Sequence, residues 1–148
     1  MKPEFTEIQQ FRQKWLWAIL VTVTAVSIYF SVINQGLQSG ILVLLLMSPI
    51  LIGLYKAKLV TKIGGNKLRY QFYPFHITER EISLDERKIE VKEYSPLLEF
   101  GGWGLRWRPG KIAFSVSGSK AIRINSDEGR EIILGTQKPE EVKEALNK

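Results

Sequence analysis

The chain has 148 residues, a net charge of +6, one histidine and no cysteine. The cysteine count excludes disulfides, thiolate nucleophiles and cysteine metal sites, and a single histidine excludes a pair of histidine ligands. The excess positive charge lies in residues 56–69, which carry five cations and no acid, whereas residues 70–148 balance at 13 against 13. Such a local basic segment suits anionic lipid headgroups better than DNA, so we expect no nucleic-acid partner, and we expect no cofactor.

The first predicted element covers residues 4–14. Phe5, Ile8, Phe11 and Trp15 recur at three- and four-residue spacing, which predicts an amphipathic helix lying in a membrane interface. We therefore assign residues 1–14 to a cytoplasmic amphipathic N-terminal segment.

Residues 15–55 contain no Asp, Glu, Lys or Arg. One crossing of a bilayer needs about 20 apolar residues, so this segment is long enough for two. The polar stretch 34–40 holds two glycines and predicts a turn between them. We expect a transmembrane helical hairpin over residues 15–56, with Pro49 kinking the second helix. A cleaved signal peptide would need a shorter apolar core, and a hairpin buried in a soluble protein would need more chain to cover it.

Cations flank the apolar segment on both sides, and none lies in the turn. The positive-inside rule then places both termini in the cytoplasm and the turn outside. We expect a multi-pass protein of the cytoplasmic (inner) membrane, in contact with membrane lipids.

Residues 57–148 have mostly period-two hydrophobicity, which is typical of half-buried strands. We predict about seven short antiparallel strands, and the apolar residues that define them fall in 58–63, 68–72, 75–78, 89–94, 112–116, 122–124 and 131–134, the third of these being the weakest. Ile82 and Leu84 come just before a predicted turn. Gly64-Gly65-Asn66, Asp85-Glu86, Ser117-Gly118-Ser119 and Ser126-Asp127-Glu128-Gly129 read as turns, and Pro74 ends the second strand.

A C-terminal helix should begin at Pro139, with Glu140 and Glu141 near its positive end and Val142, Ala145 and Leu146 on its apolar face. Strands followed by such a helix are the order of elements in pleckstrin-homology-like (PH-like) domains. The predicted fold class is therefore an α+β membrane protein: a transmembrane helical hairpin followed by a PH-like antiparallel β-barrel or sandwich with a C-terminal helix.

Several motifs resemble a family of small, uncharacterised bacterial membrane proteins that pair two N-terminal helices with a PH-like domain. They are Tyr94-Ser95-Pro96, Glu99-Phe100-Gly101-Gly102-Trp103-Gly104-Leu105-Arg106, Val116-Ser117-Gly118 and Gly135-Thr136-Gln137-Lys138-Pro139-Glu140-Glu141. Ala121 stands where the family has a glycine. The resemblance implies the architecture and no activity.

Residues 95–108 form the least explained segment of the C-terminal part, and we expect a long loop there. Tryptophans beside arginines can make cation–π contacts or anchor a partner. The predicted binding residues for a protein partner or a homo-oligomer are Tyr94, Phe100, Trp103, Arg106 and Trp107. Two alternatives remain open, in which Trp103 folds back as a core plug or the tryptophans dip into the membrane interface.

A second hypothesis is anionic lipid headgroup sensing by the first hairpin, where Lys58, Lys62, Lys67 and Arg69 resemble a phosphate-binding pattern of PH domains. The positive-inside rule explains the presence of the same cations next to the membrane without any ligand. A third possibility is an accessory subunit that packs through Ser48, Pro49 and Gly53 of the second helix. His76 has no second histidine and no obvious catalytic partner, so we expect no enzyme and no metal. The leading hypothesis is a membrane-anchored, non-enzymatic scaffold or interaction subunit.

Overall fold

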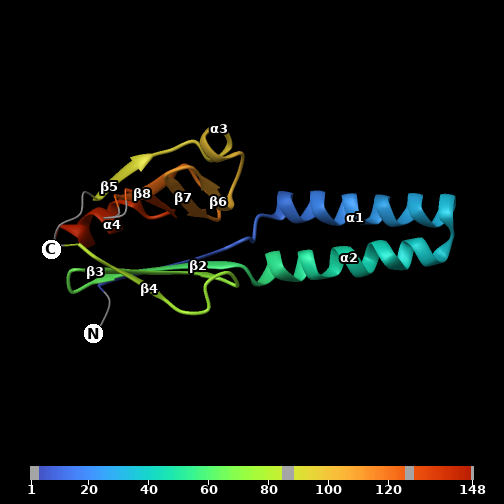
Figure 1. Ribbon diagram of the computed structural model, residues 1–148, viewed down its shortest axis with the longest axis horizontal. Coiled ribbons are helices and arrows are strands. Elements are labelled where there is room, and N and C mark those ends of the chain that lie inside the picture. Colours follow the sequence, from blue (N-terminus) through green and yellow to red (C-terminus); the bar gives the residue numbers. More distant parts are fainter. Residues whose placement is uncertain (1–3, 85–88, 126–128, 148) are drawn as a thin grey trace. The chain divides into compact units, whose positions relative to one another are not determined.

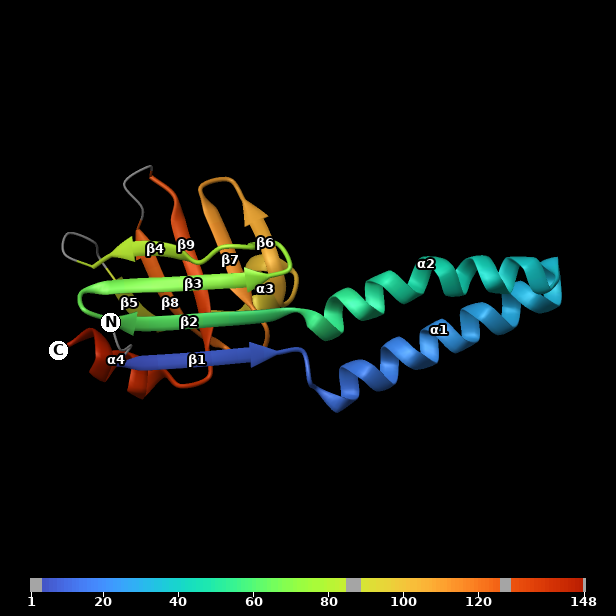
Figure 2. The same ribbon diagram turned by 90° about the horizontal axis from the view of Figure 1, so that it is seen from below.

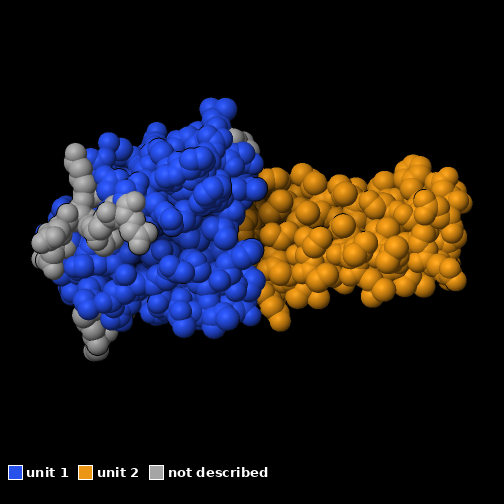
Figure 3. All heavy atoms as spheres, in the orientation of Figure 1, with its two compact units in different colours: residues 1–9, 58–148 blue, residues 10–57 orange. Residues whose placement is uncertain are grey.

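The computed structural model describes residues 4–84, 89–125 and 129–147. The chain forms two compact units (Figure 3). One, the β unit, contains residues 1–9 and 58–148, and the other, the helical unit, contains residues 10–57. The predicted turns at 85–86 and 126–129 lie wholly or mostly outside the described residues.

Two long apolar helices make up the helical unit, α1 (Lys14–Gln35) and α2 (Leu37–Lys56) (Figure 1). Both are long and apolar enough to cross a membrane, as the uncharged segment predicted. The chain reverses at Gly36, whose φ of +88° suits a residue without a Cβ. Gly40 lets the two helices approach closely, because a Cβ there would lie 2.4 Å from Cγ2 of Val32. Pro49 lies inside α2.

The predicted helix over residues 4–14 is wrong, because Phe5–Gln10 form a strand, β1. Phe5, Glu7 and Gln9 are buried and alternate with exposed residues, which is the period of a strand. The three- and four-residue spacing of the apolar residues suggested a helix because two of the three buried positions in β1 are polar. Their partners, described below, lie more than 120 residues away in the sequence.

The first sheet has the order β1-β2-β3-β4, with β2 at Lys58–Gly64, β3 at Lys67–Tyr73 and β4 at Arg80–Ser83. Figure 2 shows β1 running antiparallel to β2, so β1 ends where β2 begins. The strands predicted from 58–63 and 68–72 are confirmed, and so is the turn between them, where Gly65 and Asn66 have φ of 58° and 62°. Positive φ at both central residues is typical of a type I′ hairpin turn.

The strand predicted at Phe75–Thr78 is wrong, because this segment turns back on itself after β3. The N–H of His76 donates to the carbonyl oxygen of Phe72 (2.8 Å), and the next strand begins only at Arg80. The prediction was correct that the second strand ends at Pro74.

The second sheet has the order β5-β8-β9-β7-β6. Its strands are β5 (Ile89–Glu93), β6 (Gly104–Arg108), β7 (Lys111–Ser115), β8 (Lys120–Asn125) and β9 (Glu131–Thr136). Two expectations fail here. The pair β7–β9 is parallel, so the strands are not all antiparallel, and the expected loop at 95–108 contains a helix, α3 (Pro96–Phe100), and the strand β6.

The two sheets of the β unit face each other as layers (Figure 1), with the main apolar core between them. Phe114 of β7 contacts Tyr70 and Phe72 of β3, with ring centroids 5.4 and 5.8 Å apart. The predicted C-terminal helix is confirmed as α4 (Pro139–Leu146), which packs against β2 of one sheet and β5 of the other and buries Val142 completely.

Candidate interaction site on the second sheet

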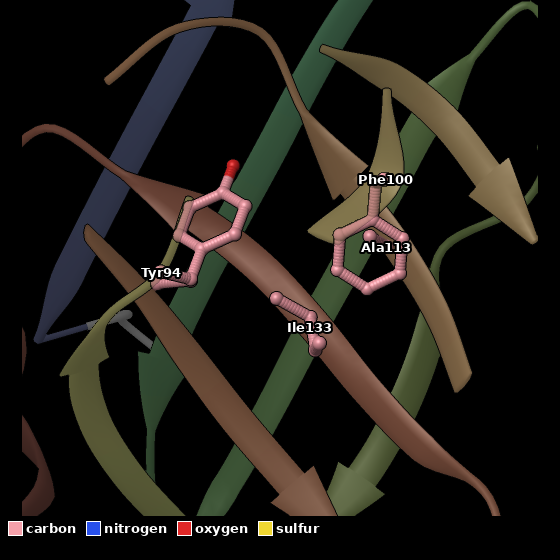
Figure 4. Close-up of a cluster of buried hydrophobic side chains, with 5 residues drawn as sticks. Tyr94, Phe100, Ala113 and Ile133 are labelled. Carbon is pink, nitrogen blue, oxygen red and sulfur yellow. The ribbon is translucent and has the colours of Figure 1, made fainter. Parts of the chain in front are cut away.

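Residues 94–103 cross the outer face of the second sheet, away from the main core, and bury a small apolar cluster there. Tyr94 and Phe100 pack with Ala113, Ala121 and Ile133 (Figure 4). The N–H of Tyr94 donates to the carbonyl oxygen of Ser119 (2.8 Å). Burial raises the pKa of the Tyr94 phenol, an effect that the Ser115 hydroxyl partly offsets. Tyr94 and Phe100 therefore hold the segment onto the sheet and offer little surface to a partner.

A charge network fixes α3 to the same face. Arg123 of β8 binds both carboxylate oxygens of Glu99 (3.2 and 2.9 Å) and one oxygen of Glu131 (3.1 Å). Lys111 pairs with the other oxygen of Glu131 at 2.8 Å. Burial alone would raise the pKa of Glu131, but the hydrogen bonds and charges of Lys111 and Arg123 outweigh it, and the pKa is lowered. These ion pairs bring together acidic and basic side chains of four elements, α3, β7, β8 and β9.

Trp103 is half-buried, and its indole N–H donates to the carbonyl oxygen of Gly118 at 3.1 Å. Gly102 and Gly104, on either side of it, have φ of +132° and +111°. These backbone angles strongly favour glycine, so the Gly-Gly-Trp-Gly stretch is a sharp turn that brings the indole to the 116–119 turn. Trp103 is thus attached to the fold without being fully buried in it.

β6 presents the exposed part of the segment. It is the terminal strand of the second sheet and pairs only with β7 among the described strands. Trp107 is 72% exposed, and Arg106 and Arg108 beside it are exposed as well. The guanidinium of Arg108 lies 5.7 Å from the centroid of the Phe100 ring, within cation–π range. Because successive side chains of a strand point to opposite faces, β6 carries the indole of Trp107 on one face and the two arginines on the other. The edge of β6 away from β7 pairs with no other described strand.

The five predicted partner residues therefore separate into two groups. Tyr94, Phe100 and Trp103 contact the rest of the β unit, whereas Arg106 and Trp107 are exposed on opposite faces of β6. Sequence reasoning missed β6 itself, the contact of Arg108 with Phe100, and the pairing of Glu99 with Arg123. The alternation of Leu105 and Trp107 with arginines was a signal for a strand, but the glycines before it favoured a loop.

Of the four cations of the proposed lipid site, Lys62, Lys67 and Arg69 are neighbours on the β2–β3 ladder, and Lys58 lies apart from them. In the β2–β3 register Lys58 lies opposite Tyr73 and Lys67 lies opposite Gly64, so these two lysines are at opposite ends of the ladder, about 20 Å apart at 3.3 Å per residue. Lys62 pairs with Glu79, while Lys67 and Arg69 (2.8 Å) share Glu81. The two cations that share it lower the pKa of Glu81. Three of the four cations are thus paired with acids.

The remaining candidate sites of the β unit, His76 and one cavity, give weaker indications of a function. Burial and the charge of Arg80 lower the pKa of His76, whose ring packs against Tyr70 and Phe114. No group of three His, Cys, Asp or Glu side chains that could hold a metal ion exists among the described residues. A cavity of about 360 Å³ beside the β2–β3 turn is lined by Glu4, Ile63, Gly64, Gly65, Asn66, Leu84, Ala145 and Leu146. Glu4 is the one charged residue in the lining of this cavity, and a single carboxylate does not indicate a particular ligand or reaction.

Comparisons of the chain with protein-family models, with curated proteins and with solved structures gave no match. The function is therefore inferred from the geometry of the chain itself.

Proposed function

We propose that this chain is a membrane-anchored, non-enzymatic interaction module at the inner face of a cytoplasmic membrane. The helical unit is the anchor, and the β unit is a PH-like module that binds a protein partner. The comparison with PH-like domains concerns the order of strands and C-terminal helix; the parallel pair β7–β9 departs from a simple succession of hairpins.

The observation that carries the proposal is the exposed Trp107 on β6, between Arg106 and Arg108. Exposed edge strands recruit extended peptides by adding a strand to the sheet, and Trp and Arg are the side chains most often found at the energetic centre of an interface. The two arginines favour an acidic segment in the partner. The site is thus suited to an extended, acid-bearing peptide segment of another protein.

The anchor is supported by the composition and surroundings of the helices. α1 and α2 carry no charged residue except Lys14, the first residue of α1, and Lys56, the last residue of α2; both lie at the end of the hairpin away from its turn. At that end of the helical unit Trp17, Tyr55 and Arg12 cluster: the two rings are 5.9 Å apart, and the guanidinium lies 4.2 Å from the Tyr55 centroid. Aromatic rings and cations collect at membrane interfaces, and cations favour the cytoplasmic one.

Purification of the tagged full chain from native membranes, solubilised in mild detergent, tests the interaction. We expect a co-purifying protein whose yield falls with Trp107→Ala and more steeply with Arg106→Glu, because the charge reversal repels an acidic segment. Ile8→Ala is the matched control, since it removes an exposed apolar side chain from the other sheet. A yield unchanged in all three variants contradicts the assignment to β6, and a second copy of the chain as the only protein recovered would identify a homo-oligomer.

Labelling tests the anchor separately. The chain has no cysteine, so a single cysteine can be introduced at will. A membrane-impermeant maleimide should label Gln38→Cys in the turn of intact cells and Lys120→Cys of the β unit only after permeabilisation. Labelling of Lys120→Cys in intact cells would contradict the proposed orientation.

Headgroup sensing by the first hairpin is the weaker alternative, because Lys58 and Lys67 lie at opposite ends of the ladder and the other cations are paired. It predicts salt-sensitive binding of the β unit to anionic vesicles that a triple change of Lys62, Lys67 and Arg69 to uncharged residues abolishes.

A further inference from the structure

The connection between β3 and β4 carries a cluster of exposed apolar side chains that the proposed partner site does not use. Tyr73, Phe75 and Ile77 are 38%, 64% and 86% exposed. Single exposed apolar residues are common on soluble domains, but three within five residues form a patch and call for a partner.

This connection is well held, although it exposes apolar side chains. The side-chain amide of Gln71 donates to the carbonyl oxygens of His76 (3.2 Å) and Ile77 (2.7 Å). The Phe75 ring stacks on the buried ring of Phe72, with centroids 5.8 Å apart. Phe75 and Ile77 are therefore held outward by a folded turn, which limits the entropy lost when the patch binds something.

The covalent chain keeps this patch close to the end of α2. Tyr73 lies opposite Lys58 in the β2–β3 register, and Lys58 follows the last residue of α2, Lys56, by two positions. Two residues span at most about 7 Å and paired strands are about 5 Å apart. Tyr73 therefore lies within roughly 12 Å of the end of α2 in every orientation of the two units.

The composition of the patch matches a membrane interface. The ammonium of Lys58 lies 6.0 Å from the centroid of the Tyr73 ring, and Lys56 precedes it. Tyrosine with lysine is the pair that settles at the level of the headgroups, and apolar side chains such as Phe75 and Ile77 enter the boundary below them. A protein partner would require no such proximity to α2.

We propose that the β3–β4 connection is a second membrane contact, in which Phe75 and Ile77 insert into the interface of the leaflet that α2 leaves. It rests on the proposed membrane anchor. The contact fixes the β unit against the bilayer at a third point, besides the two places where the chain passes into the helices. It differs from headgroup sensing because the ligand is the apolar boundary of the bilayer rather than a phosphate.

Fluorescence quenching in the reconstituted full chain tests the proposal. Single cysteines at Ile77, at Ile52 of α2 and at Ser83 are labelled with an environment-sensitive dye, and the vesicles contain lipids with a quencher at a shallow acyl position. Ser83 is the control, because it lies opposite Lys67 at the far end of β3. We expect quenching and a blue-shifted emission at 77 and 52, neither at 83, and a loss of quenching at 77 when Phe75→Asp is added.

Each result decides the question. Quenching at 52 with an Ile77 label that behaves like Ser83 overturns the second contact and leaves the anchor in place. No quenching at 52 overturns the anchor and this proposal with it. Equal quenching at 83 overturns a contact confined to this connection, and a label at 77 that is shielded in native membranes but unquenched in vesicles assigns the patch to a protein.

Discussion

Trp103 and Trp107 lie four residues apart and have opposite environments. Trp103 is tied to the Gly118 carbonyl by its indole N–H, whereas Trp107 is mostly exposed on β6. The first therefore contributes to stability, and the second is free to contribute to binding. A single tryptophan-to-phenylalanine change at each position separates the two roles.

We expect Trp103→Phe to lower the free energy of unfolding of the β unit by about 1 kcal/mol, the usual net contribution of one hydrogen bond. Trp107→Phe should leave it within about 0.5 kcal/mol, as is usual at exposed positions. Urea unfolding of the full chain in detergent micelles, followed by circular dichroism, measures both. Equal losses in the two variants would contradict the assigned roles.

The sequence indicated both tryptophans as candidates and could not rank them. The ranking required β6, which depends on pairing with β7. Gly101 and Gly102 precede this strand, Gly104 begins it, and all three have positive φ. Glycine at 101, 102 and 104 lowers the local preference for a strand. Tertiary pairing decided the conformation where local composition favoured a loop.

At the scale of elements, β1 is held by polar contacts that reach to the other sheet. The two carboxylate oxygens of the buried Glu7 accept hydrogen bonds from the Thr136 hydroxyl (2.7 Å) and from the N–H of Gln137 (2.8 Å). The side-chain amide of Gln9 donates to the carbonyl oxygen of Gly135 at 2.7 Å. These bonds join the first strand to the end of β9, the last one, and so stabilise the two layers together.

Glu7→Ala should therefore be strongly destabilising. It leaves the Thr136 hydroxyl and the Gln137 N–H without this acceptor in a buried place, and we expect a loss of about 2–3 kcal/mol, as for a hydrogen-bonded charged group. The control is Thr6→Ala, an exposed neighbour on the same strand. Unfolding midpoints in urea, compared at constant slope, give the difference. A loss no larger than that of Thr6→Ala would show that these bonds add little.

The β2–β3 and β8–β9 hairpins could be predicted from the sequence, and the long-range pairings could not. β2 with β3 and the C-terminal helix follow from local alternation, turn residues and Pro139. The parallel pair β7–β9 depends on a close approach of Gly135 to Ser115, where a Cβ on the glycine would lie 2.9 Å from the serine Cβ. β7 and β9 are neighbours in the sheet, but β8 lies between them in the sequence. No local sequence pattern predicts such a long-range contact.

At the scale of the whole molecule, the helical unit is an insertion between two neighbouring strands. β1 precedes α1, β2 follows α2, and the two strands are adjacent and antiparallel in the first sheet (Figure 2). The β unit is therefore discontinuous in sequence, and a fragment that begins at residue 60 lacks β1, part of β2 and the Glu7 contacts. Such a fragment is a poor substitute for the intact unit in binding experiments.

Excision of the hairpin should yield a folded, soluble β unit. Adjacent strands lie about 4.8 Å apart, so a Gly/Ser turn of about four residues can replace residues 11–57. We expect cooperative unfolding and a monomer by size-exclusion chromatography, with Phe75→Ser and Ile77→Ser added to remove exposed apolar surface. An excised chain that is collapsed but unfolds without cooperativity would show that the β unit depends on the helices. Glu7→Ala in the excised chain should lower its stability as in the full chain.

The insertion also restricts how the polypeptide can be threaded. Pairing of β1 with β2 requires the entrance and the exit of residues 10–57 to be in the same aqueous compartment. Any passage through a bilayer must then be made an even number of times, whatever the charges of the flanking segments. After a single crossing the six-residue strand β1 would lie on the opposite side of the bilayer from β2, and the first sheet could not be completed. Arrangements that place β1 and β2 on opposite sides of a membrane are thus excluded by hydrogen bonding alone.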